Sequence, residues 1–255
     1  MGQLDGAVAV ITGAGTGLGA ATAALFAAEG AAVTVVGRRA DKLEHVARSI
    51  ESAGGRALVV AGDVARPDTA DRAAAESIRE FGGIDILVNN AGIHATPYPL
   101  HETPLDEWQA FLDIDLTGPF LFSKAVLPSM MERGGGAVLN IGSMVALVGF
   151  KGSSAYAAAK GGLVSLTRTT AVDYAQYGIR ANCVCPGGMA PVEYGNLTDE
   201  QLALLHQAVA LAGGPLINRV AHVDEVAQLL LTLAGPNGRS LTGAVIPFDG
   251  GFTAK

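Results

Sequence analysis

The first turn of the chain reads Thr12-Gly13-Ala14-Gly15-Thr16-Gly17-Leu18-Gly19 and lies between an apolar run and an alanine-rich segment. Glycines at such a turn let the backbone come close to a pyrophosphate, whose charge then rests on the amides of a helix N-terminus. Glycine spacing alone is weak evidence, because the chain contains 34 glycines. Its place between a predicted strand and a predicted helix gives the motif its weight, and it predicts a nucleotide-binding turn.

Outward from this turn, short β-branched apolar runs alternate with longer segments of helical spacing or composition. The predicted strands are Ala7–Ile11, Val33–Val36, Ala57–Ala61, Ile84–Val88, Ala137–Ile141, Ile179–Cys185 and Ala244–Phe248. The predicted helices are Gly17–Glu29, Asp41–Ala53, Pro67–Phe81, Pro104–Arg133, Ser154–Tyr177 and Val223–Ala234. Strands this apolar are buried on both faces, which predicts a parallel α/β sheet covered by helices on each side. No linker or repeat divides residues 1–255, so a single domain is expected.

One segment interrupts the alternation. Between Pro186 and His222 the chain passes through several glycines and prolines, then a helical stretch from about Thr198 to Leu211. A long insertion after the carboxyl end of a strand lies at the edge where open α/β sheets bind ligands. Residues 187–221 are therefore predicted to form a substrate lid.

Composition excludes several classes of protein. The chain is 49% hydrophobic, and 17 basic against 24 acidic residues give a net charge of 17 − 24 = −7. The apolar content excludes disorder, and the charge gives no positive field for nucleic acid or an anionic membrane. The five histidines show no metal-ligand spacing, so no metal is predicted. Cys183 and Cys185 are interpreted as core residues on one face of a strand. The first residues carry no basic signal region, and a cytoplasmic location is expected.

A second constellation consists of Ser143, Tyr156 and Lys160. On a helix, the spacing of Tyr156 and Lys160 places both side chains on one face. An ammonium beside a phenol stabilises the phenolate, so the tyrosine can serve as a general acid or base near neutral pH. A serine hydroxyl can hold a substrate carbonyl. A Tyr-x-x-x-Lys pair on an exposed helix face is the plain alternative.

With these residues in place, the whole chain resembles a classical, single-domain short-chain dehydrogenase/reductase. The glycine turn matches the cofactor motif of that family, and Ser143, Tyr156 and Lys160 match its catalytic trio. Further matches are Asp63-Val64, Asn89-Asn90-Ala91-Gly92, Pro186-Gly187 and Asp249-Gly250-Gly251.

The resemblance implies a doubly wound, seven-stranded Rossmann sheet and an NAD(P)-dependent oxidoreductase that interconverts a ketone and a secondary alcohol. Tyr156 is then the proton donor and acceptor, Lys160 the ribose ligand and modulator of its pKa, and Ser143 the carbonyl holder. The implied cofactor contacts are Gly13, Gly15, Thr16, Gly17, Leu18, Gly19, Arg38, Arg39, Asp63, Val64, Asn90, Ala91, Gly92, Tyr156, Lys160, Pro186, Gly187 and Met189.

The sequence departs from the family pattern at two positions. Asp115 stands where the family has a catalytic asparagine, and its charge is expected to pair with Lys160 and oppose a tyrosinate. Asp115 is therefore predicted to belong to the catalytic group and to alter the pH optimum. After Pro186-Gly187, Ala190 or Pro191 replaces a family threonine, and neither supplies a hydroxyl.

The choice of cofactor depends on the end of the second strand. Gly37 occupies the place of the acidic residue that binds the ribose 2′-hydroxyl of NAD, and Arg38 and Arg39 follow. An arginine there accepts a 2′-phosphate, so NADP is favoured over NAD. The alternative is that both arginines are ordinary solvent-exposed residues in the segment that leads into the next helix.

The predicted substrate contacts are Ser143, His94, Val145, Met189 and Tyr194. Most of their neighbours are apolar, which suggests a pocket for a small apolar ketone or alcohol. The alternatives are a 3-oxoacyl thioester reductase and, from another class, a non-catalytic NAD(P)-binding regulator. A lyase or isomerase on the same scaffold also fits. The family resemblance implies a homotetramer or homodimer.

Overall fold

The computed structural model describes residues 2–94, 98–191 and 198–255, with only the backbone of residue 210. At its centre, strand β1 (Val8–Thr12) is buried along its whole length. It runs parallel to β2 (Ala32–Gly37) on one side and to β4 (Ile86–Asn89) on the other. β-branched residues dominate these strands and pack well on a pleated surface buried on both faces.

All strands of the main sheet are parallel. The outer members are β3 (Arg56–Ala61), β5 (Gly136–Ile141), β6 (Ile179–Pro186) and β9 (Val245–Phe248). The seven strands follow the order β3-β2-β1-β4-β5-β6-β9. The order reverses direction between β1 and β4, and such a switch point is where this class of sheet binds ligands. The predicted single-domain, seven-stranded Rossmann fold is confirmed.

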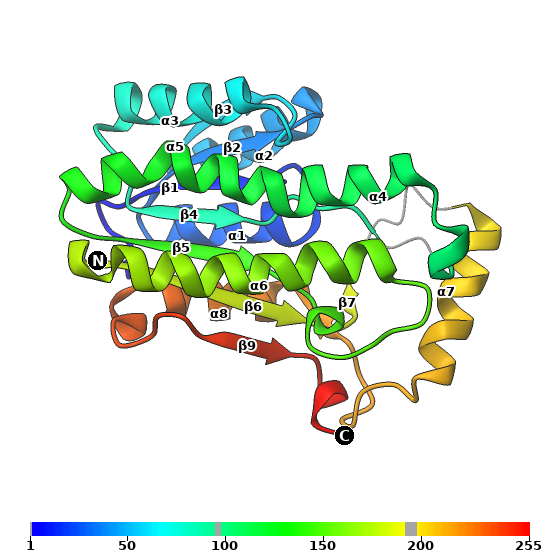
Figure 1. Cartoon of the computed structure of the whole chain (residues 1–255). Coiled ribbons are helices and arrows are strands. Elements are labelled where there is room, and N and C mark those ends of the chain that lie inside the picture. Colours follow the sequence, from blue (N-terminus) through cyan, green and yellow to red (C-terminus); the bar gives the residue numbers. More distant parts are fainter. Residues whose placement is uncertain (1, 95–97, 192–197) are drawn as a thin grey trace.

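Helices cover both faces of the sheet (Figure 1). One face is covered by α1 (Gly17–Ala28), α2 (Ala40–Ser52) and α8 (Val223–Ala234), whose apolar side chains share a core with the sheet. The other face is covered by α3 (Pro67–Phe81), α5 (Gly118–Glu132) and α6 (Ser154–Tyr174). The bounds of α3 and α8 coincide with the prediction because proline opens one helix and His222 caps the other.

The long helix predicted over 104–133 is interrupted. It consists of α4 (Leu105–Leu112), a π-helical turn (Asp113–Thr117) and α5. A π turn inserts an extra residue, and such turns recur at functional sites. This turn carries Asp115.

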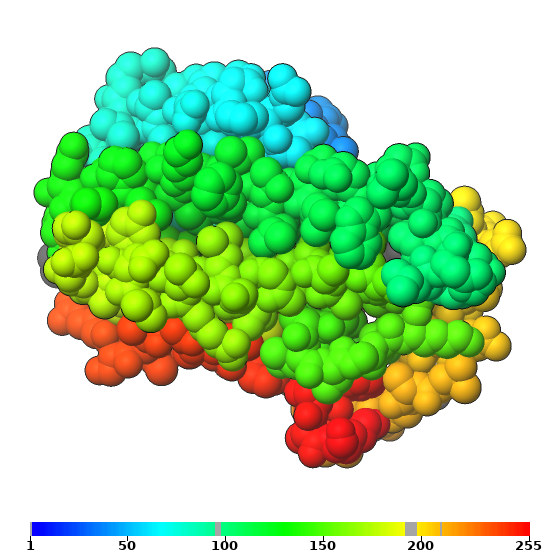
Figure 2. All heavy atoms as spheres, in the orientation of Figure 1, coloured from blue at the N-terminus to red at the C-terminus, as the bar shows by residue number. Residues whose placement is uncertain are grey.

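The segment after β6 contains β7 (Met189–Ala190), which pairs in parallel with β8 (Ala221–His222), and helix α7 (Asp199–Leu211). Helix α7 projects from the end of the molecule at which the strands point (Figures 1 and 2). Within the described residues, no helix is long and apolar enough to cross a membrane. Short 3-10 turns lie at Leu100–Glu102, Met144–Ala146, Ala175–Tyr177, Pro236–Gly238 and Phe252–Ala254.

Candidate active site

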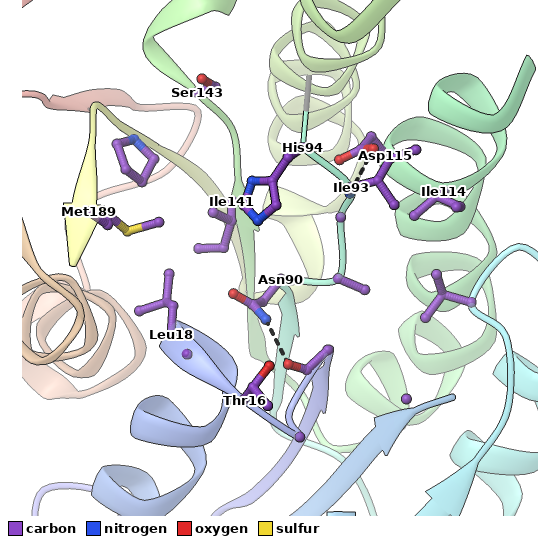
Figure 3. A pocket seen from close by; sticks show the side chains of 18 of the residues that line it. Thr16, Leu18, Asn90, Ile93, His94, Ile114, Asp115, Ile141, Ser143 and Met189 are labelled. Atoms are coloured by element: carbon purple, nitrogen blue, oxygen red, sulfur yellow. Dashed lines mark hydrogen bonds between the residues drawn. The ribbon is translucent and has the colours of Figure 1, made fainter. Parts of the chain in front are cut away.

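A cleft of about 410 Å³ opens at the carboxyl ends of β1 and β4. Figure 3 shows Thr16 and Leu18 of the glycine turn at one side, with Ser143 and Met189 farther along and His94 between them. The predicted residues that line the cleft are Gly13, Gly15, Thr16, Gly17, Leu18, Arg38, Arg39, Asp63, Val64, Asn90, Ala91, Gly92, His94, Asp115, Ser143, Tyr156, Lys160, Pro186, Gly187 and Met189. The structure thus brings together residues from most of the sequence.

Thr12 and Asn90 fix the glycine turn to the neighbouring strand. The Thr12 hydroxyl accepts hydrogen bonds from the backbone N–H groups of Asn90 and Ala91, both at 3.0 Å. The Asn90 amide donates to the carbonyl oxygens of Thr12 at 2.9 Å and Gly13 at 3.2 Å. The ends of β1 and β4 are therefore locked together across the switch point.

The turn has the shape that a dinucleotide requires. Gly13 and Gly17 have φ values of +65° and +54°, in the left-handed region that favours glycine. A Cβ at Gly13 would lie 2.8 Å from the Cα of Ala91. Thr16 precedes α1 but makes no side-chain cap, which leaves the first amides of the helix for an anion. A nicotinamide dinucleotide therefore fits the residues present.

Gly19 was predicted to contact the cofactor, but it is not among the residues that line the cleft. It lies inside the first turn of α1, where a Cβ would collide with the carbonyl oxygen of Gly13 and with the Asn90 amide. Its function is therefore close packing of the helix against the strand end.

Gly19→Ala is expected to lower the free energy of unfolding by about 1–3 kcal/mol, the usual cost of overpacking. The sign of the change in unfolding free energy separates two effects, because helix propensity alone would make alanine about 1 kcal/mol more stabilising than glycine in a helix interior. Urea denaturation measures the change. Ala24→Ser, on the exposed face of the same helix, is the control and is expected to stay within about 0.5 kcal/mol of the parent. A stabilised Gly19→Ala variant would contradict the close packing.

Two exposed arginines lie at the end of β2. Arg38 lines the cleft, and the Arg39 guanidinium donates to the Thr16 hydroxyl at 3.1 Å. Asp63 accepts a hydrogen bond from the backbone N–H of Ala65 at 3.0 Å, which fixes the turn after β3. This end of the cleft therefore carries positive charge beside the glycine turn.

Ser143, Tyr156 and Lys160 meet at the other end of the cleft. Ser143 follows β5, and the backbone N–H of Val145 donates to its hydroxyl at 3.4 Å. Tyr156 lies in the first turn of α6, and its ring packs edge-on against Phe111 with centroids 5.8 Å apart. The Lys160 ammonium lies 5.6 Å from the centre of the Tyr156 ring. Packing thus holds the phenol beside the ammonium.

Lys160 and Asp115 form a buried ion pair. The Lys160 Nζ lies 2.9 Å from Oδ1 of Asp115 and also donates to the backbone oxygen of Ile141 at 2.9 Å. The second oxygen of Asp115 accepts from the backbone N–H of Ile93 at 3.3 Å (Figure 3). The Asp115 side chain is 0% exposed. The predicted pairing of these two charges is confirmed.

These contacts move the ionisation of all three groups. Burial raises the pKa of Asp115, and the Lys160 ammonium offsets only part of that rise. Burial would lower the pKa of Lys160, but the charges of Asp115 and Tyr156 outweigh it and raise this pKa. Burial raises the pKa of Tyr156; Lys160 acts against this shift, while Asp115 adds to it.

One predicted substrate residue, Val145, does not line the cleft. Val145 is only 8% exposed and is not one of the lining residues. It is the buried residue of the 3-10 turn that follows Ser143. Tyr194 lies outside the described residues. His94 does line the cleft, and its ring points toward Ile141 (Figure 3).

Sequence reasoning missed several lining residues, most of them apolar or glycine neighbours of the motifs. Val223 enters the cleft because the two-residue pairing of β7 with β8 brings the start of α8 there, and that pairing leaves no sequence signal. The missed residues are Leu43, Gly62, Ile93, Ile114, Ile141, Gly142 and Val223, while Gly37 and Pro191, which the sequence analysis named, also line the cleft.

Cys183 and Cys185 are fully buried, and their sulfur atoms lie 3.8 Å apart on one face of β6. They are free thiols packed with Val164, as their interpretation as core residues predicted. Among the residues that the structure describes, no group of three histidine, cysteine or acidic side chains could hold a metal ion.

Comparison with known proteins identifies the family. Residues 7–201 match the short chain dehydrogenase family. The chain is 43% identical to cis-4-hydroxycyclohexanecarboxylate dehydrogenase of Sinomonas cyclohexanicum, over 97% of this chain and 96% of that protein. The chain belongs to the short-chain dehydrogenase/reductase family. This short-chain dehydrogenase/reductase is also 36% identical to meso-2,3-butanediol dehydrogenase of Serratia marcescens, over 99% and 97% of the two chains.

Among solved structures, this short-chain dehydrogenase/reductase resembles 7α-hydroxysteroid dehydrogenase complexed with NADH and 7-oxo glycochenodeoxycholic acid. The TM-score is 0.88 at 31% identity, covering 97% of this chain and 94% of that one. Members of this family bind NAD(P), and these relatives are dehydrogenases of hydroxyl groups. The chain is therefore an oxidoreductase that moves a hydride between a nicotinamide cofactor and an alcohol or ketone. The alternative of a 3-oxoacyl thioester reductase is not favoured.

Proposed function

We propose that this enzyme interconverts small, apolar secondary alcohols, alicyclic ones included, and their ketones, with Tyr156 as the general acid and base. The observation that carries the proposal is the meeting of Tyr156, Lys160 and Ser143 at one end of a cleft whose other end suits a dinucleotide. The apolar lining, with Ile93, Ile141 and Met189, and the cyclic and small alcohols named in the relatives support the substrate class.

In the proposed oxidation, the alcohol oxygen lies between Ser143 and Tyr156. Ser143 orients it, and the phenolate oxygen of Tyr156 takes its proton as the carbinol C–H bond breaks and the carbonyl forms. A nicotinamide cofactor bound in the cleft would supply the acceptor for the hydride. In the reduction, the Tyr156 hydroxyl returns the proton to the carbonyl oxygen. Lys160 holds the cofactor ribose and stabilises the phenolate.

The test is the change in absorbance of the reduced nicotinamide. The expected result is turnover with cyclohexanol or butane-2,3-diol in one direction and with cyclohexanone in the other. Purified enzyme that turns over none of these with either cofactor would contradict the proposal.

NADP is the cofactor that the arginines favour. Arg38 lines the cleft directly after Gly37, which stands at the position where an NAD enzyme carries an acidic side chain. Arg38→Ala is expected to weaken NADPH binding about 10- to 100-fold, the effect of one charge-assisted hydrogen bond, and to leave NADH binding unchanged. Calorimetric titration of both cofactors measures this. Arg48→Ala, an exposed arginine of α2 paired with Glu44, is the control. Equal losses for the two cofactors would contradict the assignment.

Residues 187–221 are proposed as a substrate lid. Helix α7 stands at the end of the molecule toward which the strands of the sheet point (Figure 1). After α7, the backbone oxygens of Gly213 and Gly214 accept from the Lys255 ammonium at 3.0 and 2.8 Å, which anchors that end of the segment. His94 and Met189 are proposed to contact the substrate from the cleft wall.

A homodimer or homotetramer is proposed from the outer surfaces of α5 and α6. The two helices lie side by side across one face of the molecule (Figure 2). Phe120 of α5 is 47% exposed and Val172 of α6 is 79% exposed, and apolar side chains of this kind suit a helix-on-helix interface. Light scattering tests the assembly. The cytoplasmic location stays a prediction.

A further inference from the structure

The ion pair between Asp115 and Lys160 has a consequence for the reacting tyrosine. The Lys160 Nζ lies 2.9 Å from the Asp115 carboxylate and 5.6 Å from the centre of the Tyr156 ring. A lone ammonium would favour the phenolate strongly. An ammonium already neutralised at contact distance presents only a small net field to the phenol, because the two opposite charges largely cancel.

The surroundings are built to hold this carboxylate. The π-helical turn places Asp115 toward the sheet, and the backbone N–H of Ile93 binds its second oxygen. Gly92 leaves the space, since a Cβ there would lie 2.6 Å from Oδ1 of Asp115 and 3.5 Å from the Lys160 Nζ. Full burial removes the water that would otherwise screen the charges.

Resting on the proposed role of Tyr156, we propose that Asp115 is a positioning residue that neutralises Lys160 and keeps Tyr156 in its protonated form through neutral pH. The enzyme then starts with the proton that ketone reduction consumes. Alcohol oxidation, which needs the phenolate, requires a more alkaline solution.

The groups that face this centre come from three parts of the chain. Lys160 and Tyr156 come from α6, a histidine comes from the segment after β4, and two thiols come from β6. The thiols act on Tyr156 and Lys160 only as minor contributions, and the histidine acts weakly on Asp115. The facing residues are Lys160, Tyr156, His94, Cys183 and Cys185.

The first test compares pH profiles of kcat in both directions for the parent enzyme and Asp115→Asn. The amide keeps the shape and an oxygen acceptor for Lys160 but removes the charge. The alkaline limb of reduction and the rising limb of oxidation are both expected to move to lower pH by at least about one unit. At a pH on the rising limb of oxidation, kcat of Asp115→Asn is then expected to exceed that of the parent about tenfold.

Asp113→Asn is the matched control. Asp113 lies on the same π turn, and its carboxylate accepts from the Gln109 amide at 2.8 Å rather than binding Lys160. Its profile is expected to match the parent. Limbs that stay in place in Asp115→Asn, or that move to higher pH, would overturn the inference. A parent enzyme inactive in both directions would instead overturn the proposed function.

A second measurement does not depend on the folding of Asp115→Asn. The near-ultraviolet tyrosinate band is titrated in the parent and in Tyr156→Phe without cofactor, and the difference isolates Tyr156. The inference expects no difference band below about pH 10, the ordinary value for tyrosine. A band that appears near neutral pH would overturn it.

Discussion

Tyr156→Phe is expected to lower kcat by about 10²- to 10⁴-fold in both directions, the usual contribution of a positioned general acid or base. The change removes only the hydroxyl. The ring keeps its edge-on contact with Phe111, and the neighbouring helix positions stay as they are. The thermal midpoint is therefore expected to stay close to that of the parent, and cofactor affinity is expected to fall far less than kcat, because Tyr156 is one of many implied cofactor contacts. Steady-state kinetics with calorimetric titration of the cofactor measures both.

Tyr177→Phe is the matched control for this substitution. Tyr177 lies in the 3-10 turn that follows α6 and is 39% exposed. Tyr177 is not one of the residues that line the cleft, so the variant is expected to keep the parent kcat. If Tyr156→Phe retained more than about a tenth of the parent kcat, the proton would have another donor and acceptor.

Lys160→Met is expected to lower the free energy of unfolding by about 3–5 kcal/mol, because it leaves the Asp115 carboxylate buried without its counter-charge. Methionine keeps most of the length of the chain, so lost packing contributes little. Cofactor binding and turnover are expected to be lost as well, because the ammonium no longer holds the ribose or stabilises the phenolate. Urea denaturation measures the stability at about pH 5 and about pH 8.

The double variant Lys160→Met/Asp115→Asn separates charge from packing. Once the carboxylate is an amide, no buried charge is left unpaired, and most of the lost stability is expected to return. Equal losses in the single and double variants would show that the ion pair contributes nothing specific.

The pH dependence of Lys160→Met has a fixed sign. Burial raises the pKa of Asp115 in the folded state, so the folded protein holds a proton that the unfolded chain releases. The folded variant is thus favoured at low pH and loses stability as the pH rises above the ordinary carboxyl range. Lys160→Met is therefore expected to be less destabilised at about pH 5 than at about pH 8.

The layered fold could be predicted from the sequence because short apolar runs, typical of strands buried on both faces, alternate with segments of helical spacing. Runs such as Val33–Val36 are buried on both faces, and the segments that flank them carry clear helix starts and stops. The edges of strands were less predictable. Ile84 is buried but precedes β4. The backbone of Asp85 still bonds to Val8 and Ala137 on the two neighbouring strands, while its side chain binds Arg133 at 2.7 Å and accepts from the backbone N–H of Val8 at 2.8 Å.

The site residues could be predicted where a few neighbouring residues in the sequence are enough to determine the local geometry. The glycine turn and the Tyr156–Lys160 spacing are such cases, and the structure brings both to one cleft. The π turn at Asp113–Thr117 was not predictable, because one inserted residue hardly changes the helical pattern. The motif shows that a glycine is needed at position 19, whereas only the packed structure shows that a Cβ there would meet the Gly13 carbonyl oxygen and the Asn90 amide.

The measurement that tests the central claim most directly follows hydride transfer from NADPH to cyclohexanone in parallel samples of the parent enzyme and Tyr156→Phe, each shown to bind NADPH. The account predicts steady loss of NADPH absorbance with the parent and a rate at least about 10²-fold lower with the variant. Equal rates in the two samples, or no turnover by a parent enzyme that binds NADPH and is offered the alcohols and ketones named above, would contradict it.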